Sequence, residues 1–258
     1  VILGGIGRIG RVSETLVPCM ALLFIGGGVM VLICHRAAIP EALERIVTGA
    51  VTPKAALGGG IGYGMAAAMR YGVARGVFTN EAGMGSSAIA HAASNTKDPA
   101  EQGMWGIFEV FIATICVCSV TALVILTSGV YQENAALLAI QSGTVTSAMV
   151  GAPLSAAAFS TVYGPFGGAF VAVCLLFFAF STILSWNFFG RLNVSWLLGE
   201  KAVGVYSVLA IGFIFLGSCL SNDLVWELAD LFNQLMVLPN VLALVTLGGL
   251  VTAACRRK

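Results

Sequence analysis

The segment Arg75-Gly76-Val77-Phe78-Thr79-Asn80-Glu81-Ala82-Gly83-Met84-Gly85-Ser86-Ser87, hereafter the polar motif, interrupts a strongly apolar chain with charged, amide and hydroxyl side chains. It contains three glycines, which permit backbone conformations that are closed to other residues. Long apolar segments flank the motif, so it is either a helix break inside a membrane or a loop at a membrane face. In both alternatives we expect it to carry the protein's chemistry.

Composition places the 258-residue chain among multi-pass membrane proteins. Hydrophobic residues make up 58% and charged residues 10%, whereas a soluble domain has about 25% charged residues. The net charge of +1 argues against a nucleic-acid partner. The cysteines form no CxxC pair and favour membrane packing over disulfides or metal binding. Because the chain opens with Val1 and without a signal peptide, we expect 1–258 to be one transmembrane domain, truncated at its N-terminus.

Six apolar segments approach or exceed the roughly 20 residues that a membrane-spanning helix needs: 16–34, 55–73, 105–126, 167–189, 202–220 and 224–254. The last is expected to break at Pro239-Asn240. The second contains five glycines within Gly58–Gly64, which indicates either close helix packing or an unwound helix whose backbone meets a ligand. We favour unwinding, with Gly60 and Tyr63 lining a binding cavity.

Basic residues orient these segments. If the first span starts inside, only Arg36, Arg45 and Lys54 of the 13 basic residues fall outside. Positive charge concentrates on the cytoplasmic side of membrane proteins. We therefore predict a protein of the plasma membrane (the inner membrane of a bacterium) with a cytoplasmic C-terminus. Residues 130–165, which contain no Lys or Arg, could form a re-entrant or surface-lying helix pair.

Several motifs together resemble the alanine or glycine:cation symporter family, also called sodium:alanine symporters. The resemblance begins with the polar motif and continues in register along almost the whole chain. The further matching segments are Pro99, Gln102-Gly103, Thr121–Leu126 with Ser128-Gly129, Phe180–Trp186, Trp226–Asp230, Leu235-Met236 and Pro239-Asn240.

The resemblance implies an all-α membrane fold similar to LeuT-type transporters of the APC superfamily, with two inverted repeats. The chain would hold core helices five to ten, about six transmembrane helices, and would lack the first core helix. The implied function is symport of Na+ with a small neutral amino acid, alanine or glycine, across the lipid bilayer by alternating access. A proton-coupled transporter and an ion channel-like protein are the alternatives, and an enzyme is not expected.

Hydroxyl side chains in the fourth apolar segment are the predicted ion and substrate ligands. The resemblance implies that Ser181 and Thr182 bind sodium. Thr182, Ser185 and Trp186 share one helical face and are predicted to contact substrate, with the indole limiting its size. The alternatives are hydroxyls that bond back to the i−4 carbonyl and an indole that only packs in the core.

Charged residues of the motif and the third segment are candidate gating groups. Glu81, beside Asn80, is predicted to pair with Arg75 or Arg70 and close an inner gate; a solvated loop is the alternative. Where the family typically has Asp in the third segment, this chain has Ala113. Glu109 lies four residues earlier on the same face, and we predict that it replaces the missing acid, since intramembrane carboxylates are costly and usually functional.

Overall fold

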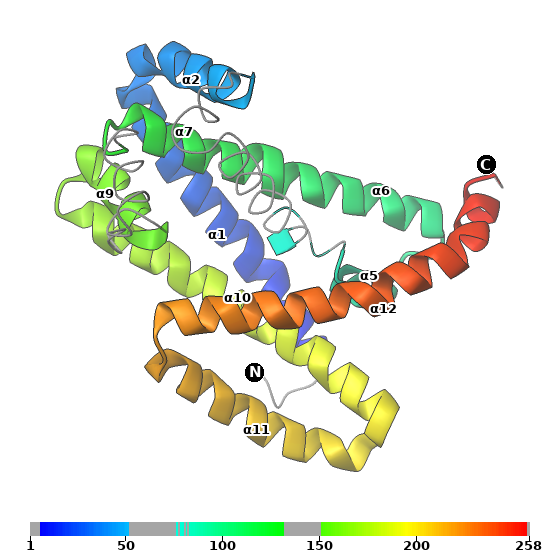
Figure 1. Ribbon diagram of the computed structural model, residues 1–258. Coiled ribbons are helices and arrows are strands. Elements are labelled where there is room, and N and C mark those ends of the chain that lie inside the picture. The colour runs from blue at the N-terminus through cyan, green and yellow to red at the C-terminus, as the bar shows by residue number, and fades with distance from the viewer. Residues whose placement is uncertain are drawn as a thin grey trace, which may run out of the picture. The chain divides into compact units, whose positions relative to one another are not determined.

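The computed structural model describes residues 6–51, 76, 78–79, 81, 83–131 and 151–256. Every regular element in these ranges is a helix (Figure 1). The chain forms two compact units: a first unit of Val1–Ile9, Ala68–Ala113 and Ile183–Lys258, and a second unit of Gly10–Ala67 and Thr114–Thr182. Two long helices, α1 (Ile6–Cys34) and α10 (Phe166–Leu198), contribute to both units.

The second unit has an apolar core built by α1, α7, α9 and α10. Its helices besides α1 and α10 are η2 (Arg36–Ala38), α2 (Ile39–Val51), α7 (Ser119–Thr127) and α9 (Gly151–Tyr163). Phe159 of α9 is fully buried and its ring centroid lies 5.7 Å from that of Phe24 and 5.3 Å from that of Phe170. Tyr163 donates a hydrogen bond to the Gly27 carbonyl at 3.1 Å. Buried aromatic contacts therefore hold α9 between α1 and α10.

The first unit contains the described part of the polar motif. Its other helices are α5 (Ser86–Ala92), α6 (Pro99–Val110), α11 (Glu200–Cys219) and α12 (Asn222–Arg256). Asp98 caps α6 by accepting a hydrogen bond from the Ala100 amide at 2.9 Å, and Pro99 occupies the first helical position, where its missing N–H costs nothing. Gly199, at a φ of 84°, makes the sharp turn between α10 and α11.

Five helical stretches are long and apolar enough to cross a membrane, which supports the expected multi-pass class. They are Val12–Cys34, Pro99–Thr127, Phe166–Leu198, Glu200–Cys219 and Leu224–Ala253. The predicted span at 55–73 lies outside the described residues. Of the region 130–165, the structure describes one helix, α9, and 132–150 also lie outside.

Two local features differ from the sequence-based expectations. The predicted break at Pro239-Asn240 is wrong: α12 runs through Pro239 as one helix (Figure 1), which is possible because membrane helices tolerate proline when neighbouring groups compensate the lost hydrogen bond. The third span is not uniformly α-helical. Residues Phe111–Cys118, hereafter the π segment, form a π-helix between α6 and α7, a rare geometry that is frequent at functional sites.

Candidate functional site

A cavity of about 210 Å³ lies in the first unit, where the polar motif meets α5, α6 and α10. It combines two carboxylates and three hydroxyls with an apolar wall. Its lining residues are Thr79, Glu81, Ser87, Ala90, Glu109, Val110, Ala113, Ser185 and Phe189. Oxygen ligands suit small hard cations, and a cavity with convergent polar groups is the default candidate for a binding site.

The backbone around Glu81 is tightly folded. Glu81 has a φ of 52°, the one positive φ at a non-glycine position among the described residues. Its amide donates to the Phe78 carbonyl at 3.2 Å and its carbonyl accepts from the Met84 amide at 3.1 Å. A left-handed backbone at a residue with a Cβ costs roughly 1–2 kcal/mol, and such positions concentrate at functional sites.

Asn240 of α12 holds this turn in place. Its side-chain amide donates to the Gly83 carbonyl at 2.9 Å. Gly85 has a φ of 84°, and a Cβ there would lie 2.9 Å from Asn240 Oδ1, so glycine is required both for the backbone angle and for the close approach. The sequence predicted that Asn240 is part of a helix break. In the structure its side chain is hydrogen-bonded to the turn that carries Glu81.

Burial raises the pKa of the Glu81 carboxyl above its ordinary value, and the negative charge of Glu109 acts in the same direction. The Ser86 hydroxyl and the Trp186 indole oppose the shift. Ser86 itself is 1% exposed. Glu81 is therefore a group that keeps its proton at a higher pH than a solvated glutamate does.

Glu109 lines the same cavity from α6, and its role in place of the missing acid stays a prediction. Its carboxylate Oε2 lies 3.9 Å from His91 Nε2, and Ala113 also lines the cavity. Ala113 belongs to the π segment, which begins at Phe111. Glu109 and Ala113 thus share one cavity, as their spacing of four residues predicts.

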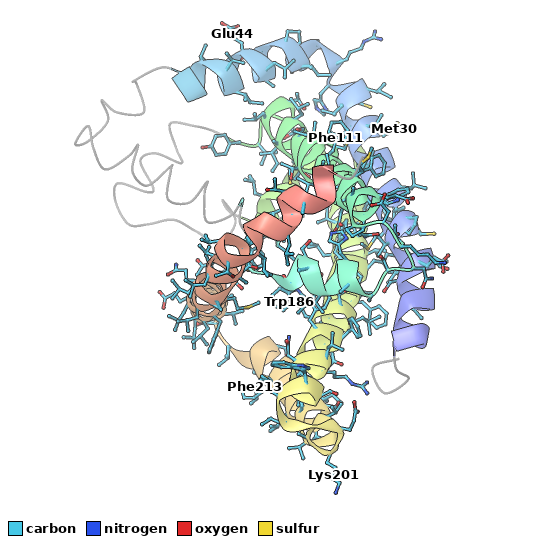
Figure 2. The ribbon with its side chains drawn as sticks, turned by 90° about the vertical axis from the view of Figure 1, so that its right-hand side faces the viewer. Met30, Glu44, Phe111, Trp186, Lys201 and Phe213 are labelled. Atoms are coloured by element: carbon cyan, nitrogen blue, oxygen red, sulfur yellow. The ribbon has the colours of Figure 1, made fainter. Side chains whose placement is uncertain are left out.

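The predicted ligands on α10 fall in two places. Ser181 and Thr182 belong to the second unit, where each hydroxyl donates to the Phe178 carbonyl, at 2.9 and 2.8 Å. These are the local hydrogen bonds of the alternative interpretation, and a role in sodium binding stays a prediction. Ser185 lines the cavity of the first unit. Trp186, labelled in Figure 2, does not line it. Its indole lies 6.2 Å from the Phe189 ring, centroid to centroid.

Four predicted site residues, Gly60, Tyr63, Arg75 and Asn80, lie outside the described residues, so the predicted ion pair of Glu81 stays a prediction. Sequence reasoning missed the contributions of Thr79 and Ser87 to the cavity wall. Their presence within the polar motif was the available signal. His91 of α5 is a further polar residue of this unit: its Nε2 lies 3.9 Å from Glu109 Oε2 and its Nδ1 lies 2.6 Å from the Gln102 side-chain nitrogen.

Several named transporters share extensive sequence identity with this chain. It is 36% identical over 253 residues to the sodium/alanine symporter AgcS of Methanococcus maripaludis, covering 98% of this chain and 52% of that protein. It is 34% identical over 257 residues to the probable sodium/glutamine symporter GlnT of Bacillus subtilis, covering 99% and 50%. It is 32% identical over 252 residues to the putative sodium/proton-dependent alanine carrier protein YrbD of Bacillus subtilis, covering 96% and 51%.

The chain thus spans about half the length of the relatives it matches. The family model described as the sodium:alanine symporter family matches residues 1–257. With its apolar helices long enough to cross a membrane, the chain belongs to the sodium:alanine symporter family, a family of transporters and not of enzymes.

Proposed function

We propose that the protein containing this chain couples the inward flow of sodium to the uptake of a small neutral amino acid, alanine or glycine, by alternating access. The match to the sodium:alanine symporter family over 1–257 carries this proposal. The relative AgcS, named a sodium/alanine symporter, supports alanine as substrate. The proposed fold is LeuT-like, with Thr182, Ser185, Trp186, Gly60 and Tyr63 at the substrate and Ser181 and Thr182 at sodium.

The energetics are adequate for uptake. One positive charge moving through about 100 mV releases about 2.3 kcal/mol, which corresponds to roughly fiftyfold accumulation of substrate before the sodium gradient is added. A secondary transporter therefore needs no further energy source. The gating role proposed for Arg75, Asn80, Glu81 and Glu109 would place charged and amide groups where access alternates.

Proton coupling is the second candidate. YrbD is named a putative sodium/proton-dependent alanine carrier, and the cavity contains Glu81, a carboxyl whose pKa is raised by burial. A carboxyl that binds and releases a proton during the transport cycle is what proton coupling requires. The two ions are distinguished by which gradient drives uptake.

The test is uptake of labelled alanine by the complete gene product in proteoliposomes, with an inward sodium gradient, an inward proton gradient, or neither. Thr182→Ala is measured beside Thr246→Ala, a matched control in which an α12 hydroxyl bonds the Leu242 carbonyl at 3.0 Å. Sodium-driven uptake that Thr182→Ala abolishes and Thr246→Ala preserves supports the proposal. Uptake driven only by the proton gradient would show that the coupled ion is the proton and not sodium. If labelled alanine accumulates under neither gradient, coupled transport is refuted.

A further inference from the structure

Helix α2 is amphipathic, and its apolar face is left uncovered by the part of the chain that the structure describes. Leu43, Ile46 and Val47 are 48%, 42% and 62% exposed. Their spacing of three and four residues places the three aliphatic side chains on one stripe of the helix. Contact between such a stripe and water is unfavourable, so the stripe requires an apolar neighbour.

The opposite face of α2 is charged and suited to water. Arg45 donates a hydrogen bond to Glu41 Oε1 at 2.7 Å, and both side chains are more than half exposed. Thr48 lies on the same side, where its hydroxyl donates to the Glu44 carbonyl at 2.7 Å. Figure 2 shows the Glu44 side chain projecting away from α1. The two faces of α2 therefore suit two different environments.

The position of α2 places it at a face of the membrane. The helix begins at Ile39, five residues beyond the end of the span Val12–Cys34. It also packs against α7, whose last residue ends the span Pro99–Thr127. Figure 1 and Figure 2 both show that α2 turns sharply away from the direction of α1. A helix that meets the ends of two spans and turns away from one of them lies along the bilayer surface.

The apolar stripe follows directly on the exposed apolar surface of α1. In the last turns of that span, Val29, Met30 and Ile33 are 41%, 51% and 59% exposed. A specific protein interface uses roughly 20–30 residues on each side, many more than the three side chains of the stripe. Because α2 carries two acidic residues and only one basic residue, attraction to anionic lipid contributes little to its membrane contact.

We propose that α2 is an interfacial anchor that lies in the plane of the membrane surface. Leu43, Ile46 and Val47 are buried by about 5–10 Å in the boundary between lipid headgroups and acyl chains, and the face with Glu41 and Arg45 meets water. The partner is the lipid surface itself, which the helix recognises by apolar area and not by headgroup charge. This inference goes beyond the proposed function and does not depend on the transported ion or substrate.

The experiment measures how deep each side of α2 lies in phosphatidylcholine vesicles that contain the complete gene product. A nitroxide spin label is attached to one cysteine at a time, in a background that lacks the native cysteines and keeps the wild-type melting temperature. The readout is the ratio of its collision rates with oxygen, which concentrates in lipid, and with a water-soluble nickel chelate. For burial of this depth, we expect the ratio to be about threefold or more higher at Leu43→Cys and Val47→Cys than at the adjacent controls Glu44→Cys and Thr48→Cys.

Two other results of this measurement overturn the proposal. Frequent collisions with the nickel chelate at all four positions would place both faces of α2 in water. Rare collisions with both reagents at Leu43→Cys and Val47→Cys would show that protein covers the stripe. In that case, dipolar broadening between labels would identify a second copy of the chain, and its absence would identify another segment of the same gene product.

Charge variants test whether lipid holds the helix in place. Leu43→Glu should lift the stripe out of the lipid and lower the ratio at Ile46→Cys about twofold or more, because a charged side chain opposes burial at the interface. Thr48→Glu, on the polar face, should leave that ratio unchanged. An unchanged ratio in Leu43→Glu contradicts anchoring by lipid. Replacing about a third of the phosphatidylcholine by anionic phosphatidylglycerol should have no effect, and a ratio that rises with anionic lipid contradicts recognition by apolar area.

Discussion

Glu81 combines a strained backbone conformation with a carboxyl whose pKa is raised. Its left-handed φ of 52° is stabilised by turn hydrogen bonds on both sides and by the hydrogen bond from the Asn240 side chain to the Gly83 carbonyl. The same fold buries its carboxyl beside Glu109, so that the pKa is raised. Strain of this kind persists only where the surrounding structure enforces it, which supports a functional role for the turn.

Glu81→Gln should stabilise the protein at neutral pH. Because the folded state raises the carboxyl's pKa above its ordinary value of about 4.5, the stabilising effect of its proton is complete below that pH and is lost as the pH rises through the raised pKa. Glutamine mimics the protonated form at every pH. Melting temperatures in detergent should therefore diverge in favour of the variant as pH rises. Glu44→Gln on exposed α2 serves as control, and a lower melting temperature for Glu81→Gln at neutral pH contradicts this account.

Glu109→Gln should impair sodium-driven uptake by at least about tenfold, which corresponds to a loss of about 1.4 kcal/mol or more. The variant keeps the size of the side chain and removes the charge that faces the cavity. Glu101→Gln, in the first turn of the same helix, is the matched control and should transport as the wild type does. Initial rates of labelled alanine uptake decide the matter, and wild-type rates in Glu109→Gln would show that this carboxylate does not replace the missing acid at Ala113.

At the scale of elements, glycines set how closely neighbouring helices approach. Gly167, at the start of α10, packs against the backbone of Ser160 in α9, and Gly190 packs against the Tyr206 ring of α11. The first of these contacts belongs to the turn between α9 and α10, where Gly164 adopts a φ of 56°. Small residues let membrane helices approach closely. In this chain, the glycines that a close helix contact requires can be distinguished from neighbouring glycines that have space around them.

Gly167→Ala should destabilise the second unit by about 1–3 kcal/mol, because the added Cβ overlaps the Ser160 backbone, which cannot move aside as a side chain could. Its neighbour Gly168 has nothing within 4 Å of the corresponding position. Gly168→Ala should therefore be neutral or stabilise α10 by up to about 1 kcal/mol. Thermal unfolding of the two variants in detergent compares them directly, and equal effects would show that the close approach at Gly167 is unimportant.

At the scale of the whole molecule, the described spans expose most of their large apolar side chains. Phe213 on α11 is 69% exposed and projects outward (Figure 2), and Trp196 on α10 is 85% exposed. Exposing so continuous an apolar surface to water is unfavourable, whereas contact with lipid or with further membrane helices is favourable. The exposed surface therefore fits a multi-pass membrane protein whose relatives are about twice as long.

The placement of basic residues predicts a cytoplasmic C-terminus. We expect a green fluorescent protein fused after Lys258 to be fluorescent in a bacterial host, because this reporter folds only on the cytoplasmic side. Alkaline phosphatase fused at the same point should be inactive, since it requires the oxidising exterior. Active phosphatase without fluorescence would reverse the orientation. Fusions in the exposed helix α2, expected outside, provide the control with the opposite pattern.

Most of the all-helical architecture follows from the sequence alone. Apolar segments of about 20 residues have one stable form in lipid, the helix, because backbone groups must be hydrogen-bonded internally. The start of α6 is explained locally, because Asp98 accepts a hydrogen bond from one of the first amide groups of the helix. The apolar segment 105–126 alone predicted a later start. The polar motif also pointed to Glu81 without any knowledge of the fold, because its charge is anomalous in an apolar chain.

Only the tertiary structure decided which of these groups meet. Asn240 bonds Gly83 across 157 residues, and Ser185 shares a cavity with Glu81 and Glu109, because packing selects which helix faces come together and local sequence does not. The same reason explains His91, which looks like an isolated interfacial residue until Gln102, Gly106 and Glu109 form the surface beneath it. The sequence determined which polar and charged side chains the protein has. The packing of apolar side chains around them determined which of these groups lie next to one another.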